Sequence, residues 1–251
     1  MFLKPCQING SSFVTDIVAN DYRTAEVFRK YGIEYCCGGK WPLEMVCATK
    51  DIDIKILTKE LEEATRTVHV PNSLPFNEWD IDFLADYIVH VHHHYLKKQL
   101  PEIKSTLLKF AEEHREKYQY MDELEKTFLQ LYKELLPHLQ QEEETIFPYI
   151  RQITHAFQSR ESYASLLVKT MRKPIEVIMN HEYEMVAGSL YRMRELTSDY
   201  TPPDRACTNH KVTYSRLKEL DNDLVQHMHL ENNILFPRAI EMEKILLGKT
   251  S

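Results

Sequence analysis

An internal repeat is the feature that most constrains how this chain can fold. The segment HLQQEEETIFP begins at His138 and the segment HMHLENNILFP begins at His227, and both read His-x3-Glu with Phe-Pro nine and ten residues after the histidine. The His, Glu, Phe and Pro are each displaced by 89 residues between the two segments. His93 and His181 precede the segments by 45 and 46 residues, and a tyrosine lies two residues after each of them. One half of this region therefore repeats the other.

Helical periodicity runs through nearly all of the chain, and only 6 of its 251 residues are glycine. Apolar residues recur at three- and four-residue steps in four long stretches, at 80–114, 119–151, 160–198 and 209–246. Long helices joined by short connections predict an antiparallel four-helix bundle. The expected fold class is all-α.

The part of the chain before the bundle predicts a separate small helical domain. Residues 1–65 contain several short helical patterns, whereas residues 66–78 (RTVHVPNSLPFNE) contain two prolines and no apolar stripe. Such a segment is typical of a connection rather than of a helix. We therefore interpret 66–78 as a linker and 79–251 as the bundle domain.

The repeated His-x3-Glu pairs fall on the apolar stripes of their helices, where leucine would be expected. These stripes face the interior of a bundle, and an ionised carboxylate buried there without a partner is strongly destabilising. A pair of metal ions would compensate both carboxylates, and imidazole with carboxylate is a ligand set that suits iron or manganese. The predicted metal ligands are His93, His138, Glu142, His181, His227 and Glu231.

The histidine supplied by the first helix has competitors. His90 lies one turn before His93 and could share its face, and only His92 gives the 89-residue offset to His181. The tyrosine that follows both His93 and His181 at the second residue favours His93. His90 and His92 remain open as alternatives.

Composition narrows the remaining classes of function. The formal net charge of -7 disfavours a general binder of nucleic acid or of anionic membranes. The sequence contains no run of 18 apolar residues, so no membrane-spanning helix is predicted. The first residues lack the apolar segment of a signal peptide. Five cysteines without the spacing of a disulfide scaffold indicate a reducing compartment. We therefore expect a cytoplasmic protein.

The histidine and glutamate plan of the four helices resembles that of hemerythrin-like domains. The stretches Phe28-Arg-Lys-Tyr31 and Tyr35-Cys-Cys-Gly-Gly-Lys40, together with LENNILFP at 230–237, resemble the RIC (repair of iron centres) proteins of bacteria. The two resemblances together cover nearly the whole chain. They imply a non-haem di-iron protein that repairs iron–sulfur clusters damaged by nitric oxide or peroxide, with iron ligands at the same six residues that the repeat predicts.

The family also carries acidic residues that gate the site. Glu134, one turn before His138, matches one of them, whereas the residue before His181 is often glutamate in the family and is Asn180 here. Only Glu134 is therefore carried over. Four imidazoles, two bridging carboxylates and an oxo or hydroxo bridge leave about one open position on each of the two irons, if both are octahedral.

Cys36 and Cys37 form a second candidate site, in a Cys-Cys-Gly-Gly turn between two predicted helices. Lys40 and a helix N-terminus nearby are expected to favour the thiolate form. The alternative is a tight turn with small buried cysteines. The resemblance favours a functional role.

Three classes of function follow from these observations. The first is repair of damaged iron–sulfur proteins, with the di-iron centre donating iron or carrying out redox chemistry. The second is an enzyme that reduces nitric oxide or peroxide, and the third is a reversible carrier or sensor of O2 or nitric oxide. The Cys-Cys-Gly-Gly domain favours the first class, because a carrier needs no thiol module.

Overall fold

The computed structural model describes residues 8–35, 41–65, 74–160, 166, 168–169 and 175–248, and the side chains of 175–184 lie outside that description. The chain divides into two compact units, Met1–Asn72 with Tyr200–Lys218 and Ser73–Asp199 with Glu219–Ser251. Each unit has its own hydrophobic core.

The first unit is built from short helices, α1 (Val14–Asn20), α2 (Thr24–Lys30), α3 (Leu43–Lys50) and α4 (Ile54–Thr65). Gly32 follows α2 with a φ of 61°, a left-handed conformation that glycine adopts without strain. The next amide, of Ile33, donates to the Phe28 carbonyl at 2.8 Å and closes the helix end. The unit's core also includes Val212, which explains why Tyr200–Lys218 belongs to this unit.

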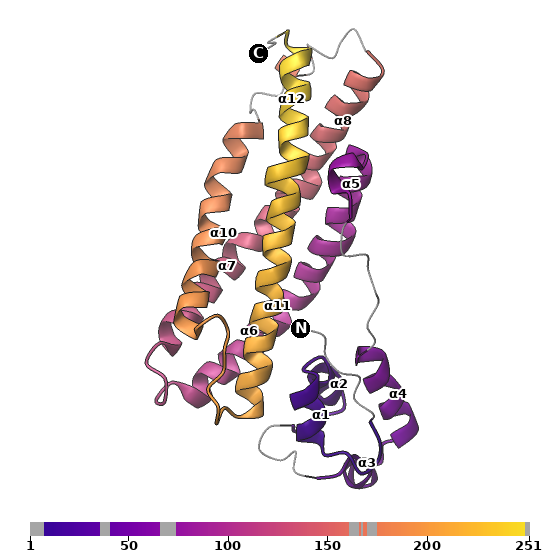
Figure 1. Ribbon diagram of the computed structural model, residues 1–251, viewed down its shortest axis with the longest axis vertical. Coiled ribbons are helices and arrows are strands. Elements are labelled where there is room, and N and C mark those ends of the chain that lie inside the picture. Colours follow the sequence, from indigo (N-terminus) through magenta and orange to yellow (C-terminus); the bar gives the residue numbers. More distant parts are fainter. Residues whose placement is uncertain are drawn as a thin grey trace. The chain divides into compact units, whose positions relative to one another are not determined.

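In the second unit, helical segments lie alongside one another to form a bundle (Figure 1). In chain order they are α5 (Ile81–Tyr87), η2 (Ile88–His93), α6 (His94–His114), α7 (Met121–Gln141), η3 (Glu142–Ile146), α8 (Phe147–Gln158), α10 (Ile175–Thr197), α11 (Thr208–Leu230), η4 (Glu231–Leu235) and α12 (Phe236–Leu246). Helix α11 belongs to this unit from Glu219 onward. Helix α7 packs against α6 and α10, and α8 packs against α12. The predicted all-α four-helix bundle, preceded by a small helical domain, is confirmed.

The entrance to the first bundle helix is fixed locally. Asp80 is its N-cap, and its Oδ1 accepts a hydrogen bond from the amide of Asp82 at 2.8 Å. Such a cap satisfies one of the amides that a helix start leaves without an intrahelical partner. A short 3₁₀ turn, η1 (Phe76–Glu78), precedes it.

Three of the four bundle segments widen into a π-helical turn, at η2, η3 and η4. In the second and fourth segments the cause lies in the repeat, because η3 and η4 directly precede Phe147-Pro148 and Phe236-Pro237. Proline lacks an N–H and its ring collides with the carbonyl four residues before it, and a wider turn relieves that collision. Such turns often mark functional sites.

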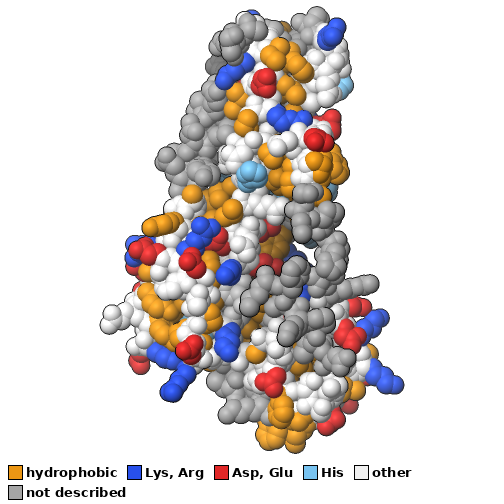
Figure 2. Space-filling model, viewed as in Figure 1, with side chains coloured by type: hydrophobic (Ala, Val, Ile, Leu, Met, Phe, Trp, Pro, Cys, Tyr) orange, Lys and Arg blue, Asp and Glu red, His pale blue; other side chains and the backbone are white. Residues whose placement is uncertain are grey.

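On the face shown in Figure 2, acidic and basic side chains of the described residues are interspersed, so neither sign of charge dominates that face. None of the described helices has the length and apolar character needed to cross a membrane.

Candidate metal centre

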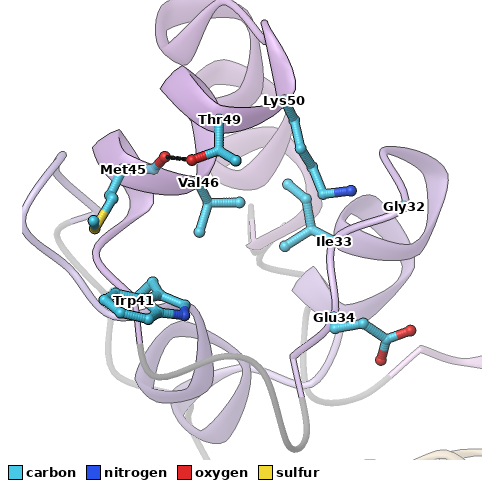
Figure 3. A pocket seen from close by; sticks show the side chains of 8 residues that line it. All are labelled: Gly32, Ile33, Glu34, Trp41, Met45, Val46, Thr49 and Lys50. Atoms are coloured by element: carbon cyan, nitrogen blue, oxygen red, sulfur yellow. Dashed lines mark hydrogen bonds between the residues drawn. The ribbon is translucent and has the colours of Figure 1, made fainter.

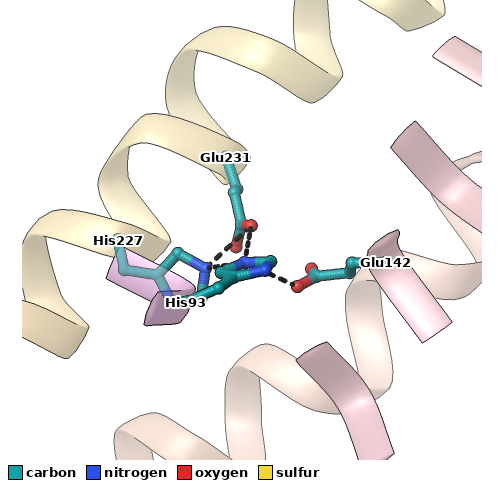
Figure 4. A group of neighbouring side chains, drawn as sticks. All are labelled: His93, Glu142, His227 and Glu231. Carbon is teal, nitrogen blue, oxygen red and sulfur yellow. Dashed lines mark hydrogen bonds and ion pairs between the residues drawn. The ribbon is translucent and has the colours of Figure 1, made fainter. Parts of the chain in front are cut away.

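Four buried side chains from three segments of the bundle converge on one point (Figure 4). They are His93 at the end of η2, Glu142 at the start of η3, His227 in α11 and Glu231 at the start of η4. One ligand atom from each lies within 4.8 Å of all the others, and all four residues are buried. Thus η2, η3 and η4 each contribute one of these residues.

The ring nitrogens and carboxylate oxygens of this group lie close together, both within one helical segment and between segments. The Nε2 atoms of His93 and His227 are 3.0 Å apart, and His227 Nε2 lies 2.9 Å from Glu231 Oε1. His93 Nε2 lies 3.4 Å from Glu142 Oε2 and 3.7 Å from Glu231 Oε1. Two imidazole nitrogens and two carboxylates therefore face a common space, which is the arrangement of a metal site.

The charges of the group are unbalanced. Burial, together with the nearby charge of Glu231, raises the pKa of Glu142 above its ordinary value. Burial alone would also raise the pKa of Glu231, but the charge of His227 and hydrogen bonds from His227 and His93 lower it. The Glu142 oxygens lie 3.1 Å from His138 Nε2 and 3.4 Å from His93 Nε2, and these contacts do not offset the effect of burial and of Glu231. A cation placed between the two carboxylates would remove this imbalance, so the residues present fit a bound metal.

The histidine of the second helix lies at the edge of the group. His138 Nε2 is 3.1 Å from Glu142 Oε1, and 15% of its side chain is exposed. It lines a cavity of about 390 Å³ together with Glu134 and Met185. The predicted site residues Glu134 and His138 therefore line the same cavity, which gives small molecules a route to His138.

Three predicted site residues lie outside what the structure describes. The backbone of His181 belongs to α10, but its side chain is not among those described. Cys36 and Cys37 fall in residues 36–40, outside the described ranges. Their predicted roles remain predictions.

The competing histidines of the first helix separate clearly. His93 is in the group of four, whereas His90 is exposed. His92 is also buried, but its Nδ1 lies 2.9 Å from Asp223 Oδ1. Its ring stacks on that of His227, with centroids 5.8 Å apart.

Sequence reasoning missed the residue that orients His93. Glu143 Oε1 lies 2.8 Å from His93 Nδ1, and Lys97 Nζ lies 2.5 Å from Glu143 Oε2. Burial opposes ionisation of Glu143, but hydrogen bonds from Lys97 and His93 lower its pKa below the ordinary value. A carboxylate on the second ring nitrogen fixes the tautomer of a metal-binding histidine and directs its other nitrogen to the metal. The adjacent Glu142-Glu143 pair in the sequence was the available signal.

The first unit contains a pocket of its own, with a volume of about 380 Å³ (Figure 3). Ile33 and Glu34 form one side of it, and Trp41 and Met45 form the other. Residues 33–34 and 41 flank the Cys36-Cys37 segment in the sequence. More than half of the Trp41 side chain is exposed.

Two family models match this chain. A hemerythrin HHE cation-binding domain matches residues 84–239, and a domain of unknown function (DUF542) matches residues 10–65. The first match contains every residue of the buried group and covers more than half of the chain. The bundle is therefore a cation-binding domain of the hemerythrin type.

The chain is also similar to proteins named iron-sulfur cluster repair protein YtfE. Those of Escherichia coli strains UMN026 and IAI1 and of Shigella boydii strain Sb227 are each 33% identical over 221 residues, which cover 88% of this chain and 93% of the relative. Together with the two domain matches, this similarity shows that the chain belongs to the RIC (repair of iron centres) family.

Proposed function

We propose that this protein repairs iron–sulfur clusters damaged by nitrosative or oxidative stress, using a di-iron centre in its bundle. The observation that carries the proposal is the buried group of two histidines and two glutamates, in a chain that matches named repair proteins along most of its length. The proposed partners are damaged iron–sulfur proteins, and nitric oxide, O2 and peroxide as small molecules. The proposed compartment is the cytoplasm.

The proposed ligand set has two halves. His93 and His227 lie together on one side of the group, and His138 lies beside Glu142 on the other. His181 is assigned to the second half from the repeat alone, because its helix corresponds to that of His93. Glu142 and Glu231 would hold the metal together with these histidines. Nitrogen and oxygen ligands of this kind suit iron.

The surroundings of the two halves support ligand exchange. The cavity beside His138 and Glu134 gives one half a path to solvent, whereas His93 and His227 are almost fully buried. When bound, the irons would supply exchangeable metal and redox capacity. The residues around them orient the ligands, and Glu134 is proposed to control what passes through the cavity.

The two cysteines of the small domain are proposed to handle the damaged client. Cysteine thiolates are the usual ligands of iron–sulfur clusters, so Cys36 and Cys37 could hold iron or a cluster fragment during exchange. The match of residues 10–65 to a domain found as a separate family model supports a module with its own role.

The proposal is tested by anaerobic incubation of the iron-loaded protein with a nitric-oxide-damaged cluster enzyme. Iron content is followed on both proteins, together with the activity of the client. We expect the activity of the client to recover. In proportion to that recovery, iron should leave the repair protein or the oxidation state of its iron should change. If an equal amount of free ferrous iron restores the client at the same rate, the proposal is wrong.

The cavity at His138 also favours a second candidate, an enzyme that reduces nitric oxide or peroxide. A space of about 390 Å³ that opens onto a metal-ligand histidine admits such small molecules. Multiple turnovers of nitric oxide by the protein alone, with an electron donor, would favour this reading over repair.

A further inference from the structure

The His92–Asp223 pair lies beside the metal centre without belonging to the group of four. The contact of His92 with Asp223 determines its tautomer. Asp223 Oδ1 lies 2.9 Å from His92 Nδ1, and because a carboxylate only accepts, Nδ1 must carry the hydrogen. In the neutral ring, the lone pair is then on Nε2.

This is the same arrangement that the structure gives to His93. His93 Nδ1 is held by Glu143, and its Nε2 faces the buried group. His92 Nδ1 is held by Asp223, and its Nε2 is buried and has no partner among the described residues. Two consecutive histidines are therefore each prepared, by a carboxylate on Nδ1, to offer Nε2 to a metal.

A purely structural role does not account for the pair. Leaving a buried polar atom without a partner costs about 1–3 kcal/mol, and here both His92 Nε2 and Asp223 Oδ2 are in that position in the described part of the chain. The ring of His92 is fixed between Tyr87, at 5.6 Å edge-on, and His227, stacked at 5.8 Å. The pair is thus a rigid, half-satisfied polar group in contact with a proposed iron ligand.

The internal repeat relates Asp223 to an acidic residue in the other half of the bundle. Adding the 89-residue offset to Glu134 gives Asp223, so the two acidic residues occupy equivalent positions one turn before the His138 and His227 of their helices. Glu134 lines the cavity that opens onto His138. Asp223 lies next to the other half of the centre, and 17% of its side chain is exposed. Each half therefore has an acidic residue at its margin.

We propose that His92 and Asp223 form a transfer position for iron on the His93–His227 half of the centre. In this role Asp223 attracts the ferrous ion at the partly exposed margin, and His92 Nε2 binds it transiently as it enters or leaves. No proton need be displaced, because the hydrogen of His92 is already on Nδ1. The inference rests on the proposed di-iron function and adds a route for the more deeply buried iron.

The test measures iron release from the full-length, iron-loaded protein to excess ferrozine under anaerobic conditions. The variants are His92→Phe, which retains an aromatic ring against His227, and Asp223→Asn, which retains an acceptor for Nδ1 but not the charge. His90→Phe is the matched control, because His90 belongs to the same η2 segment but is exposed. Iron per chain and the Mössbauer spectrum are recorded before release.

We expect His92→Phe to retain its iron and to release one of the two irons about tenfold more slowly, the lower end of the effect seen for residues that support metal ligands. Asp223→Asn should slow the same phase by less, and His90→Phe should match the wild type. Wild-type or faster release in both His92→Phe and Asp223→Asn would overturn the proposal. So would loss of one iron from freshly prepared His92→Phe, since His92 would then be a resident ligand.

Two further measurements keep the result interpretable. If His92→Phe does not fold, His92→Gln and Asp223→Asn decide the question, because Asp223 is at the margin of the core. Repair of a damaged client by the wild type is measured separately. A wild type that releases iron through this route but repairs nothing would refute the proposed function and leave the transfer position standing.

Discussion

The two buried glutamates of the metal centre should respond in opposite ways to the same substitution. Glu142 lies 3.1 Å from His138 Nε2, but burial and the charge of Glu231 still raise its pKa. Glu231 is paired with His227 at 2.9 Å, and its pKa is lowered. Without metal, one carboxylate destabilises the fold and the other stabilises it.

The magnitudes follow from these environments. Glu142→Gln removes a buried charge that its histidine contacts do not fully compensate, and we expect the metal-free protein to gain about 1–3 kcal/mol at pH 7. Glu231→Gln leaves His227 an acceptor but not the charge of its buried partner, and we expect a loss of about 3–5 kcal/mol, the cost of breaking a buried ion pair. Both variants should lose much of the bound iron and the magnetic coupling between the ions, because each removes a proposed bridge.

The pH dependence has opposite signs for the two residues. The pKa of Glu142 in the folded state lies above the ordinary 4.5, so its contribution is most favourable below pH 4.5 and is lost as the pH rises through the raised value. The pKa of Glu231 lies below 4.5, so its contribution is present above pH 4.5 and is lost as the pH falls. Glu142→Gln should therefore reduce the loss of stability that the wild type shows above pH 4.5.

Urea unfolding of the metal-free proteins, followed by far-UV circular dichroism at several pH values, measures these effects. The midpoint should rise for Glu142→Gln and fall for Glu231→Gln at an unchanged m-value. Iron analysis of the same preparations supplies the second readout. Equal destabilisation by the two substitutions would refute the assignment of Glu142 as the less compensated of the two buried charges.

Other predictions concern the ligands, the thiols and the domains. His93→Ala should lose iron while His90→Ala retains it, and iron analysis showing the reverse would contradict the assignment of His93. Changing Cys36 and Cys37 together to Ser should leave the di-iron spectrum intact and slow repair of a damaged client; repair at the wild-type rate would exclude the thiol role. A fragment beginning near Asn77 should bind both irons, because it contains every proposed ligand. It should also unfold at lower temperature than the full chain, because Tyr200–Lys218 would lose the rest of its unit, and an unchanged melting temperature would argue against that packing.

The sequence predicted much of this architecture because the determining features are periodic. Three- and four-residue spacing gives the buried face of a helix, and the 89-residue repeat indicates which faces correspond. These two features selected Glu142, His227 and Glu231 before their convergence was known, and they left His93 in competition with His90 and His92. Neither feature specifies partners on different helices. His92 and Asp223 are in contact although they lie 131 positions apart in the chain. A single sequence does not indicate that two such distant residues meet.

The π-helical turns show a second limit of periodicity. Periodicity allowed His90 to share the face of His93, the 89-residue offset pointed to His92, and the choice among the three stayed open. In η2 both His92 and His93 are buried, because a turn of more residues rotates successive side chains by a smaller angle. Of the three candidate ligands on this helix, His93 lies in the buried group of four, His92 is buried beside it, and His90 is exposed.

The repeat and its departures make the two halves of the proposed di-iron centre unequal. The ligand residues are preserved between the halves, but their surroundings differ: Glu143 corresponds to Asn232, and His92 corresponds by the 88-residue offset of His93 and His181 to Asn180. Only the His93 side therefore has a carboxylate and a second imidazole of this kind behind it. Ligands held by charged partners bind metal more tightly than ligands without them, and His93 and His227 are also more deeply buried than His138. We therefore expect the iron on that side to be the retained one and the iron beside the His138 cavity to be the exchangeable one. A dedicated transfer position is then needed only for the retained iron, and the His92–Asp223 pair lies on that side.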